Sequence, residues 1–161
     1  LYSMPVYGGT DHFINKVLPQ YGITGIGFTP EETLEEILQK SEKARVKLVY
    51  VETPANPTNA LFDLELCRKV ADQLSNEENS VYVVVDNTYM GPLWQHPLQH
   101  GADLVMYSAT KYIGGHSDLI AGAVLGKKDL MKRVRTLRTF LGNMAGPWTG
   151  WLLMRSLETL K

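Results

Sequence analysis

The feature of this sequence that most constrains its fold is a series of short apolar runs that alternate with helical patterns. The run at residues 81–85 contains four valines and one tyrosine, with no polar residue between them. A strand that is apolar at every position is typical of a parallel sheet covered on both faces. Similar runs occur at 47–51, 104–107 and 121–125, and a weaker one at 23–28. We expect each of these runs to form a strand.

Helical patterns fill the segments between the runs. Thr29, Pro30 and Glu32 predict a helix start with a capping box, and Asp63 predicts a second start. Apolar residues at helical spacing mark four helices, at 34–38, 64–74, 130–141 and 151–157. Because such alternation requires crossover connections, we predict an α/β fold of three layers, with a largely parallel sheet and helices on both faces.

Composition and charge exclude several classes of protein. The chain has 161 residues and 44% hydrophobic residues, which fits one globular domain. Sixteen basic and seventeen acidic residues give a net charge of -1, so we expect no nucleic-acid or membrane partner. The basic stretch at 127–138 alternates with apolar residues and predicts the solvated face of a helix. Cys67 is the only cysteine, which is typical of a reducing compartment, and we expect a cytoplasmic location. The four histidines have no metal-ligand spacing, so no metal site is predicted.

Polar residues follow the predicted strand at 104–107, at the strand end where α/β sheets bind ligands. Ser108 and Thr110 can donate hydrogen bonds to a phosphate, and Lys111 is a candidate nucleophile. Gly114 and Gly115 allow a close approach of the backbone to a ligand. A surface turn with a solvated lysine explains these residues equally well from their spacing alone.

Three further positions could serve the same site. Asp86 ends the apolar run at 81–85, where a carboxylate is costly unless it meets a cation or hydrogen-bond donors; its alternative role is a turn cap. Asn56 follows the run at 47–51 in a loop that two prolines restrict. Tyr7 precedes Gly8 and a predicted helix, and its ring could stack on a flat ligand or belong to the core.

The stretch at 103–117, Asp-Leu-Val-Met-Tyr-Ser-Ala-Thr-Lys-Tyr-Ile-Gly-Gly-His-Ser, resembles the cofactor-attachment signature of a known family. The family is that of the Cys/Met metabolism enzymes that use pyridoxal 5′-phosphate (PLP), and it includes cystathionine γ-lyase, methionine γ-lyase, cystathionine γ-synthase and O-acetylhomoserine sulfhydrylase. Shorter matches follow the family's order at 7–10, 56–58, 86–88 and 151–160. The resemblance covers the whole chain.

The resemblance implies an aspartate-aminotransferase-like fold, which is the large domain of PLP fold type I. Residues 1–161 would form this PLP-binding domain, and the N-terminal arm and C-terminal small domain of the family would lie outside them. The implied cofactor is PLP. The family pattern also implies a sulfur amino-acid substrate and a homo-oligomer, a tetramer built from dimers.

Specific roles come from the same resemblance, position by position. Lys111 would carry PLP on its amino group and then move protons between substrate carbons. Asp86 would pair with the pyridinium nitrogen, and Tyr7 would stack on the ring and serve as an acid or base. The remaining cofactor contacts would be the phosphate holders Ser108 and Thr110, Asn56 near the phenolic oxygen, and Thr88 beside the ring.

The implied activity is γ-elimination on methionine or cystathionine, which yields a 2-oxo acid, ammonia and a thiol. A γ-replacement transferase, either an O-acetylhomoserine sulfhydrylase or a cystathionine γ-synthase, is the alternative. Gly9 stands where methionine γ-lyases often have cysteine, and the stretch at 7–10 is more similar to cystathionine γ-lyase or a sulfhydrylase. The stretch at 86–92 resembles several branches of the family and does not distinguish between them. A non-catalytic PLP-binding fragment is a third interpretation.

Overall fold

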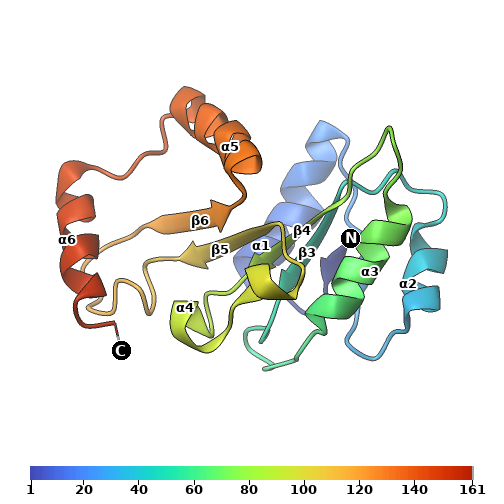
Figure 1. Ribbon diagram of the computed structural model, residues 1–161, viewed down its shortest axis with the longest axis horizontal. Coiled ribbons are helices and arrows are strands. Elements are labelled where there is room, and N and C mark those ends of the chain that lie inside the picture. The colour runs from blue at the N-terminus through green and yellow to red at the C-terminus, as the bar shows by residue number, and fades with distance from the viewer. Residues whose placement is uncertain (161) are drawn as a thin grey trace.

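The computed structural model describes residues 1–160, and it contains one six-stranded sheet in the order β2-β1-β3-β4-β5-β6 (Figure 1). The first five strands pair in parallel, and β6 is antiparallel to β5. The predicted α/β class with a largely parallel sheet is confirmed. The strands are β1 (Tyr2–Ser3), β2 (Gly27–Phe28), β3 (Leu48–Glu52), β4 (Tyr82–Asp86), β5 (Leu104–Ser108) and β6 (Gly122–Gly126).

Helices connect the parallel strands and extend beyond β6. In Figure 1, α2 and α3 lie side by side at one end of the molecule, while α5 and α6 lie beyond β5 and β6 at the other. The helical elements are α1 (Gly8–His12), the π-helical turn η1 (Phe13–Val17), the 3-10 turns η2 (Leu18–Tyr21) and η3 (Pro97–His100), α2 (Leu34–Ser41), α3 (Leu64–Leu74), α4 (Gly91–Trp94), α5 (Lys128–Leu141) and α6 (Pro147–Leu157).

The centre of the sheet is buried on both faces, as the apolar runs predict. Val49 and Val51 of β3 have no exposed surface and belong to the larger core cluster, which includes side chains of α2 and α3. Tyr50 lies between them in the sequence and packs instead against the second cluster, which contains Tyr2 and Ile14. Because alternate residues of a strand point to opposite faces, these two clusters cover the two faces of β3.

Strand register places the carboxyl ends of three strands together. Glu52, the last residue of β3, pairs with Asp86, the last residue of β4, and Asp86 pairs with Met106 near the end of β5. Side chains that follow these strands therefore emerge at one edge of the sheet. The two-residue strand β1 is too short to give a periodic pattern, and the apolar runs do not predict it.

The start of α2 differs from the sequence prediction. The capping box is formed by Thr33 and Glu36, not by Thr29 and Glu32. Two such pairs stand in tandem in the sequence, and the helix begins after the second. The first pair forms a turn in which Glu32 accepts a hydrogen bond from the Thr29 N–H at 2.9 Å and pairs with Lys40. The predicted cap at Asp63 is confirmed, because its carboxylate accepts from two N–H groups in the first turn of α3.

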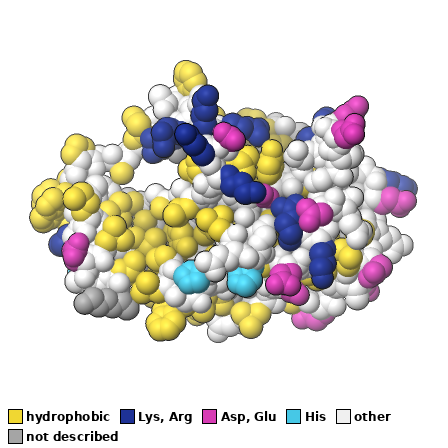
Figure 2. Space-filling view, in the orientation of Figure 1, with side chains coloured by type: hydrophobic (Ala, Val, Ile, Leu, Met, Phe, Trp, Pro, Cys, Tyr) yellow, Lys and Arg dark blue, Asp and Glu magenta, His cyan; other side chains and the backbone are white. Residues whose placement is uncertain are grey.

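The helices at the β6 end expose much of their apolar surface. The basic residues of α5 are solvated as predicted, but its apolar stripe is also open, with Leu137 60% exposed and Phe140 83% exposed. Trp148 and Trp151 of α6 stack on each other and are more than half exposed. Figure 2 shows hydrophobic side chains gathered over this half of the molecule. Within residues 1–160, no helix has the length and apolar character needed to cross a bilayer.

Cys67 lies in α3 and is 2% exposed. Burial and the nearby Asp63 carboxylate raise the pKa of the Cys67 thiol to about 12. A thiol with so high a pKa stays protonated and is a poor nucleophile at neutral pH. Cys67 is therefore a small core residue.

Thr33→Ala removes the cap of α2, and we expect it to lower the free energy of unfolding by about 1 kcal/mol, because a first-turn N–H loses its acceptor. Thr33→Ser retains the hydroxyl and is the matched control, with stability close to that of the unmodified chain. Urea denaturation followed by circular dichroism measures both variants. Equal losses for Ala and Ser would contradict the assigned cap.

Candidate active site

A cavity of about 890 Å³ opens at the edge where β3, β4 and β5 end. Its lining includes side chains from the loops after all three strands and from the start of α1. The structure thus brings together Tyr7, Asn56 and Asp86, which the sequence indicated could serve the same site as Lys111. The seven residues to which the resemblance assigns a role at the cofactor all line this cavity: Tyr7, Asn56, Asp86, Thr88, Ser108, Thr110 and Lys111.

Two donors fix the carboxylate of Asp86. The Tyr50 hydroxyl donates to Oδ2 at 3.2 Å, and the Thr88 N–H donates to Oδ1 at 3.0 Å. Burial, and then the Asp86 charge, raise the pKa of Tyr50 well above its usual range, so the hydroxyl keeps its proton and acts as the donor. Each carboxylate oxygen has a second lone pair, so Asp86 can still accept from a cationic group in the cavity.

Thr88 also ties β4 to β5. Its hydroxyl accepts a hydrogen bond from the Ser108 N–H at 2.7 Å, at the last residue of β5. The same residue therefore contacts Asp86 through its backbone and Ser108 through its side chain. These bonds set the spacing between the Asp86 carboxylate and the backbone of Ser108 across two strands.

A compact turn presents Lys111 at the cavity. Its N–H donates to the Ser108 carbonyl at 3.1 Å, and its carbonyl accepts from the Gly115 N–H at 2.7 Å. Two glycines make this turn possible. A Cβ on Gly114 would lie 2.7 Å from the Ala109 carbonyl oxygen, and Gly115 has a φ of +70°, which side chains rarely tolerate. The Lys111 side chain is exposed to the cavity and to solvent.

Thr110 has an internal partner as well as a place in the cavity wall. Its hydroxyl donates to the Ala121 carbonyl at 3.2 Å and accepts from the Ala121 N–H at 3.0 Å. This pair of bonds fastens the lysine turn to the segment just before β6. A ligand phosphate would compete with the Ala121 carbonyl for the Thr110 proton.

Glu52 is a wall residue that the sequence interpretation did not single out. It is 5% exposed, and its two carboxylate oxygens accept from the N–H groups of Tyr7 and Asn56, each at 2.8 Å. Burial raises the pKa of Glu52, an effect that exceeds the opposing hydrogen bonds. The available signal was an acidic residue that ends an apolar run, the same signal that pointed to Asp86.

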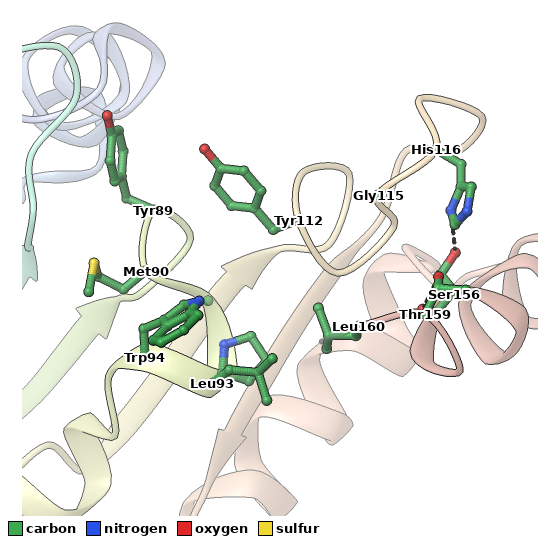
Figure 3. A pocket seen from close by; sticks show the side chains of 12 residues that line it. Tyr89, Met90, Leu93, Trp94, Tyr112, Gly115, His116, Ser156, Thr159 and Leu160 are labelled. Carbon is green, nitrogen blue, oxygen red and sulfur yellow. Dashed lines mark hydrogen bonds between the residues drawn. The ribbon is translucent and has the colours of Figure 1, made fainter.

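A smaller cavity of about 480 Å³ adjoins the first (Figure 3). The two cavities share Tyr89, Tyr112 and Gly115, while Leu93 and Trp94 of α4 line only the smaller one. His116 lies at its far side, 3.4 Å from the Ser156 hydroxyl. Among residues 1–160, no group of three or more acidic, histidine or cysteine side chains is placed to hold a metal, and no arginine lines either cavity.

This set of side chains suits one kind of cofactor. Asp86 offers a carboxylate for a protonated ring nitrogen, Ser108 and the glycine turn offer donors for a phosphate, and Lys111 offers an amine for a carbonyl. The exposed ring of Tyr7 can stack on an aromatic ligand. The fold and site thus define an α/β protein whose residues fit PLP.

Comparison with known proteins agrees with this class. The family model described as "Cys/Met metabolism PLP-dependent enzyme" matches residues 1–161. The chain is 40% identical over 156 residues to cystathionine γ-lyase of Bacillus subtilis, and 41% identical over 157 residues to L-methionine γ-lyase of Treponema denticola. It is 34% identical over 156 residues to a probable cystathionine γ-synthase of Herpetosiphon aurantiacus. Each alignment covers 96% of this chain, but 39%, 38% and 47% of the respective relative.

The fold agrees with a solved relative. The crystal structure of metB from Corynebacterium glutamicum superposes with a TM-score of 0.88 at 31% sequence identity, covering 99% of this chain and 40% of the other. The chain belongs to the Cys/Met metabolism PLP-dependent enzyme family. The cofactor of that family is pyridoxal 5′-phosphate, and the chain spans about two fifths of the length of the two γ-lyases.

Proposed function

We propose that this chain is the PLP-binding domain of a carbon-sulfur lyase that acts on methionine or cystathionine. The reaction would be a γ-elimination that releases a thiol, ammonia and a 2-oxo acid. The observation that carries the proposal is the convergence of Lys111, Asp86 and Ser108 on one cavity. The γ-lyases among the relatives support the choice of reaction.

Lys111 and Asp86 have complementary parts in this proposal. PLP supplies a carbonyl that reacts with amines and a ring that accepts electrons from the substrate. The Lys111 amine would hold the cofactor and would serve as the base for the proton on the substrate Cα. The Asp86 carboxylate would keep the ring nitrogen protonated, and its bonds to Tyr50 and Thr88 hold the carboxylate in place.

Tyr7 is the proposed proton donor to the departing sulfur, because its side chain lines the cavity and is exposed. Ser108 and Thr110 are assigned to the phosphate, and Thr110 would exchange its bond to Ala121 for one to a phosphate oxygen. We assign Asn56 to the phenolic oxygen of PLP and Thr88 to the side of the ring.

Location and assembly form a second part of the proposal. We place the protein in the cytoplasm, and the single buried thiol of Cys67 is compatible with that compartment. We also propose a homo-oligomer, a tetramer built from dimers. The exposed apolar side chains of α5 and α6 support an assembly that covers them.

A γ-replacement transferase is the second candidate, and the probable cystathionine γ-synthase among the relatives favours it. Product analysis separates the two, with L-methionine, L-cystathionine, or O-acetylhomoserine plus sulfide as substrates. We expect ammonia, a thiol and a 2-oxo acid from the first two. Homocysteine formed from O-acetylhomoserine and sulfide, without ammonia, would establish the transferase. PLP binding with no turnover of any substrate would leave a non-catalytic PLP-binding chain.

Asp86→Asn tests the acid assigned to the ring nitrogen. We expect PLP to remain bound, while Cα proton removal slows by several orders of magnitude, equivalent to about 4 kcal/mol or more in the barrier. The reason is that a neutral pyridine ring accepts electrons poorly. The matched control is Asp72→Asn, because Asp72 is an exposed side chain of α3 paired with Arg68. Exchange of the substrate α-proton in deuterium oxide measures the step, and near-normal exchange in Asp86→Asn would contradict the role.

A further inference from the structure

Glu52 connects two loops that the proposed function places on the cofactor. We propose that Glu52 is a positioning residue that sets the distance between Tyr7 and Asn56 across the cavity and thereby tightens PLP binding. The inference rests on the proposed function, since it needs Tyr7 and Asn56 to contact the cofactor. It adds a residue that the family signature around Lys111 does not contain.

The contacts of Glu52 reach both sides of the cavity. Oε2 accepts from the Tyr7 N–H, which precedes α1 and is 45 positions away in the sequence. Oε1 accepts from the Asn56 N–H in the loop after β3. Hydrogen bonds from backbone N–H groups to an ionised carboxylate are among the stronger ones in proteins. One side chain thus joins two segments that the chain itself does not hold together.

Side-chain packing does little to hold the two residues that Glu52 joins. Tyr7 is 58% exposed and Asn56 is also exposed, so few neighbours fix their side chains. Their positions must come from the backbone. Glu52 is in turn fixed on the sheet, because it is the last residue of β3 and its own N–H donates to the buried Ser3 hydroxyl at 2.9 Å. The hydrogen bonds of Glu52 therefore hold the backbones of Tyr7 and Asn56 in place relative to the sheet.

Stability alone does not explain a carboxylate at this position. Glu52 pairs across the sheet with Asp86, so two acidic groups lie side by side at the cavity wall. Burial and the neighbouring acid both disfavour the ionised form of Glu52. A buried carboxylate usually contributes less to the stability of the fold than an apolar side chain would, unless its oxygens are needed to accept hydrogen bonds. In this structure each carboxylate oxygen of Glu52 accepts a hydrogen bond from a loop that lines the ligand cavity.

Glu52→Gln is the most direct test, because it keeps the size of the side chain but directs an NH₂ group at one of the two N–H donors. Glu32→Gln is the matched control. Glu32 also accepts a backbone N–H, that of Thr29, and it does not line the cavity. Glu52→Asp keeps the charge but shortens the side chain, so it cannot reach both N–H groups, and it serves if Glu52→Gln does not fold.

Two measurements read the outcome. Hydrogen exchange followed by NMR in the cofactor-free protein should show the Tyr7 or Asn56 amide exchanging about tenfold faster in both Glu52 variants, as expected for one lost charge-assisted bond. Fluorescence titration should show the Kd for PLP rising by about tenfold or more. In Glu32→Gln, both amides and the Kd should match the unmodified chain.

Unchanged exchange at Tyr7 and Asn56 would overturn the bridging role. Faster exchange with an unchanged PLP Kd would overturn the link to the cofactor. Full restoration of the Kd in Glu52→Asp would show that charge, not reach, is what matters, and would also contradict the proposal. If the unmodified protein binds no PLP, the proposed function itself fails, and the exchange data still decide whether Glu52 holds the two loops.

Discussion

Parallel pairing of β3, β4 and β5 is the constraint on which the rest of this structure depends. The register sets Glu52 beside Asp86 and brings the end of β5 to the same edge. Polar residues that are far apart in the sequence therefore lie at one edge of the sheet and share one cavity. The valines of β3 and β4, buried in the core beneath α2 and α3, fix that register, because a shift by one residue would turn every side chain to the opposite face.

The chemistry at this edge depends on hydrogen bonds that restrain each reactive group. Asp86 is held by Tyr50 and Thr88, and Thr88 also binds the backbone of Ser108. Lys111 is carried by a turn that has glycine at two positions, one where a Cβ would clash with the backbone and one with a positive φ. A carboxylate and a turn backbone held in this way lose little further freedom when a ligand binds, which favours accurate placement of a cofactor.

Much of this arrangement could be predicted from the sequence, and the exceptions have physical reasons. The apolar runs identified β3 to β6 to within one residue at each end, because each of these strands carries a short run of apolar residues bounded by polar or glycine residues. The start of α2 was misplaced because two capping pairs stand in tandem and only packing selects the second. β1 has too few residues to give a pattern that predicts a strand. Glu52 was not identified as a site residue because its role depends on a hydrogen bond with Tyr7, which is distant in the sequence and close only in the folded chain. The exposure of the apolar side chains of α5 could not be predicted from the sequence either. Periodicity indicates that a helix has an apolar face, but not which part of the protein covers that face.

The central claim is that Lys111 carries the cofactor in this cavity. Borohydride reduction of the PLP-loaded protein, followed by proteolysis and mass spectrometry, tests it most directly, because reduction makes the lysine linkage permanent. The account predicts a pyridoxyl group on the peptide that contains Lys111. A pyridoxyl group on Lys127, Lys128 or any other lysine, or on none, would contradict it.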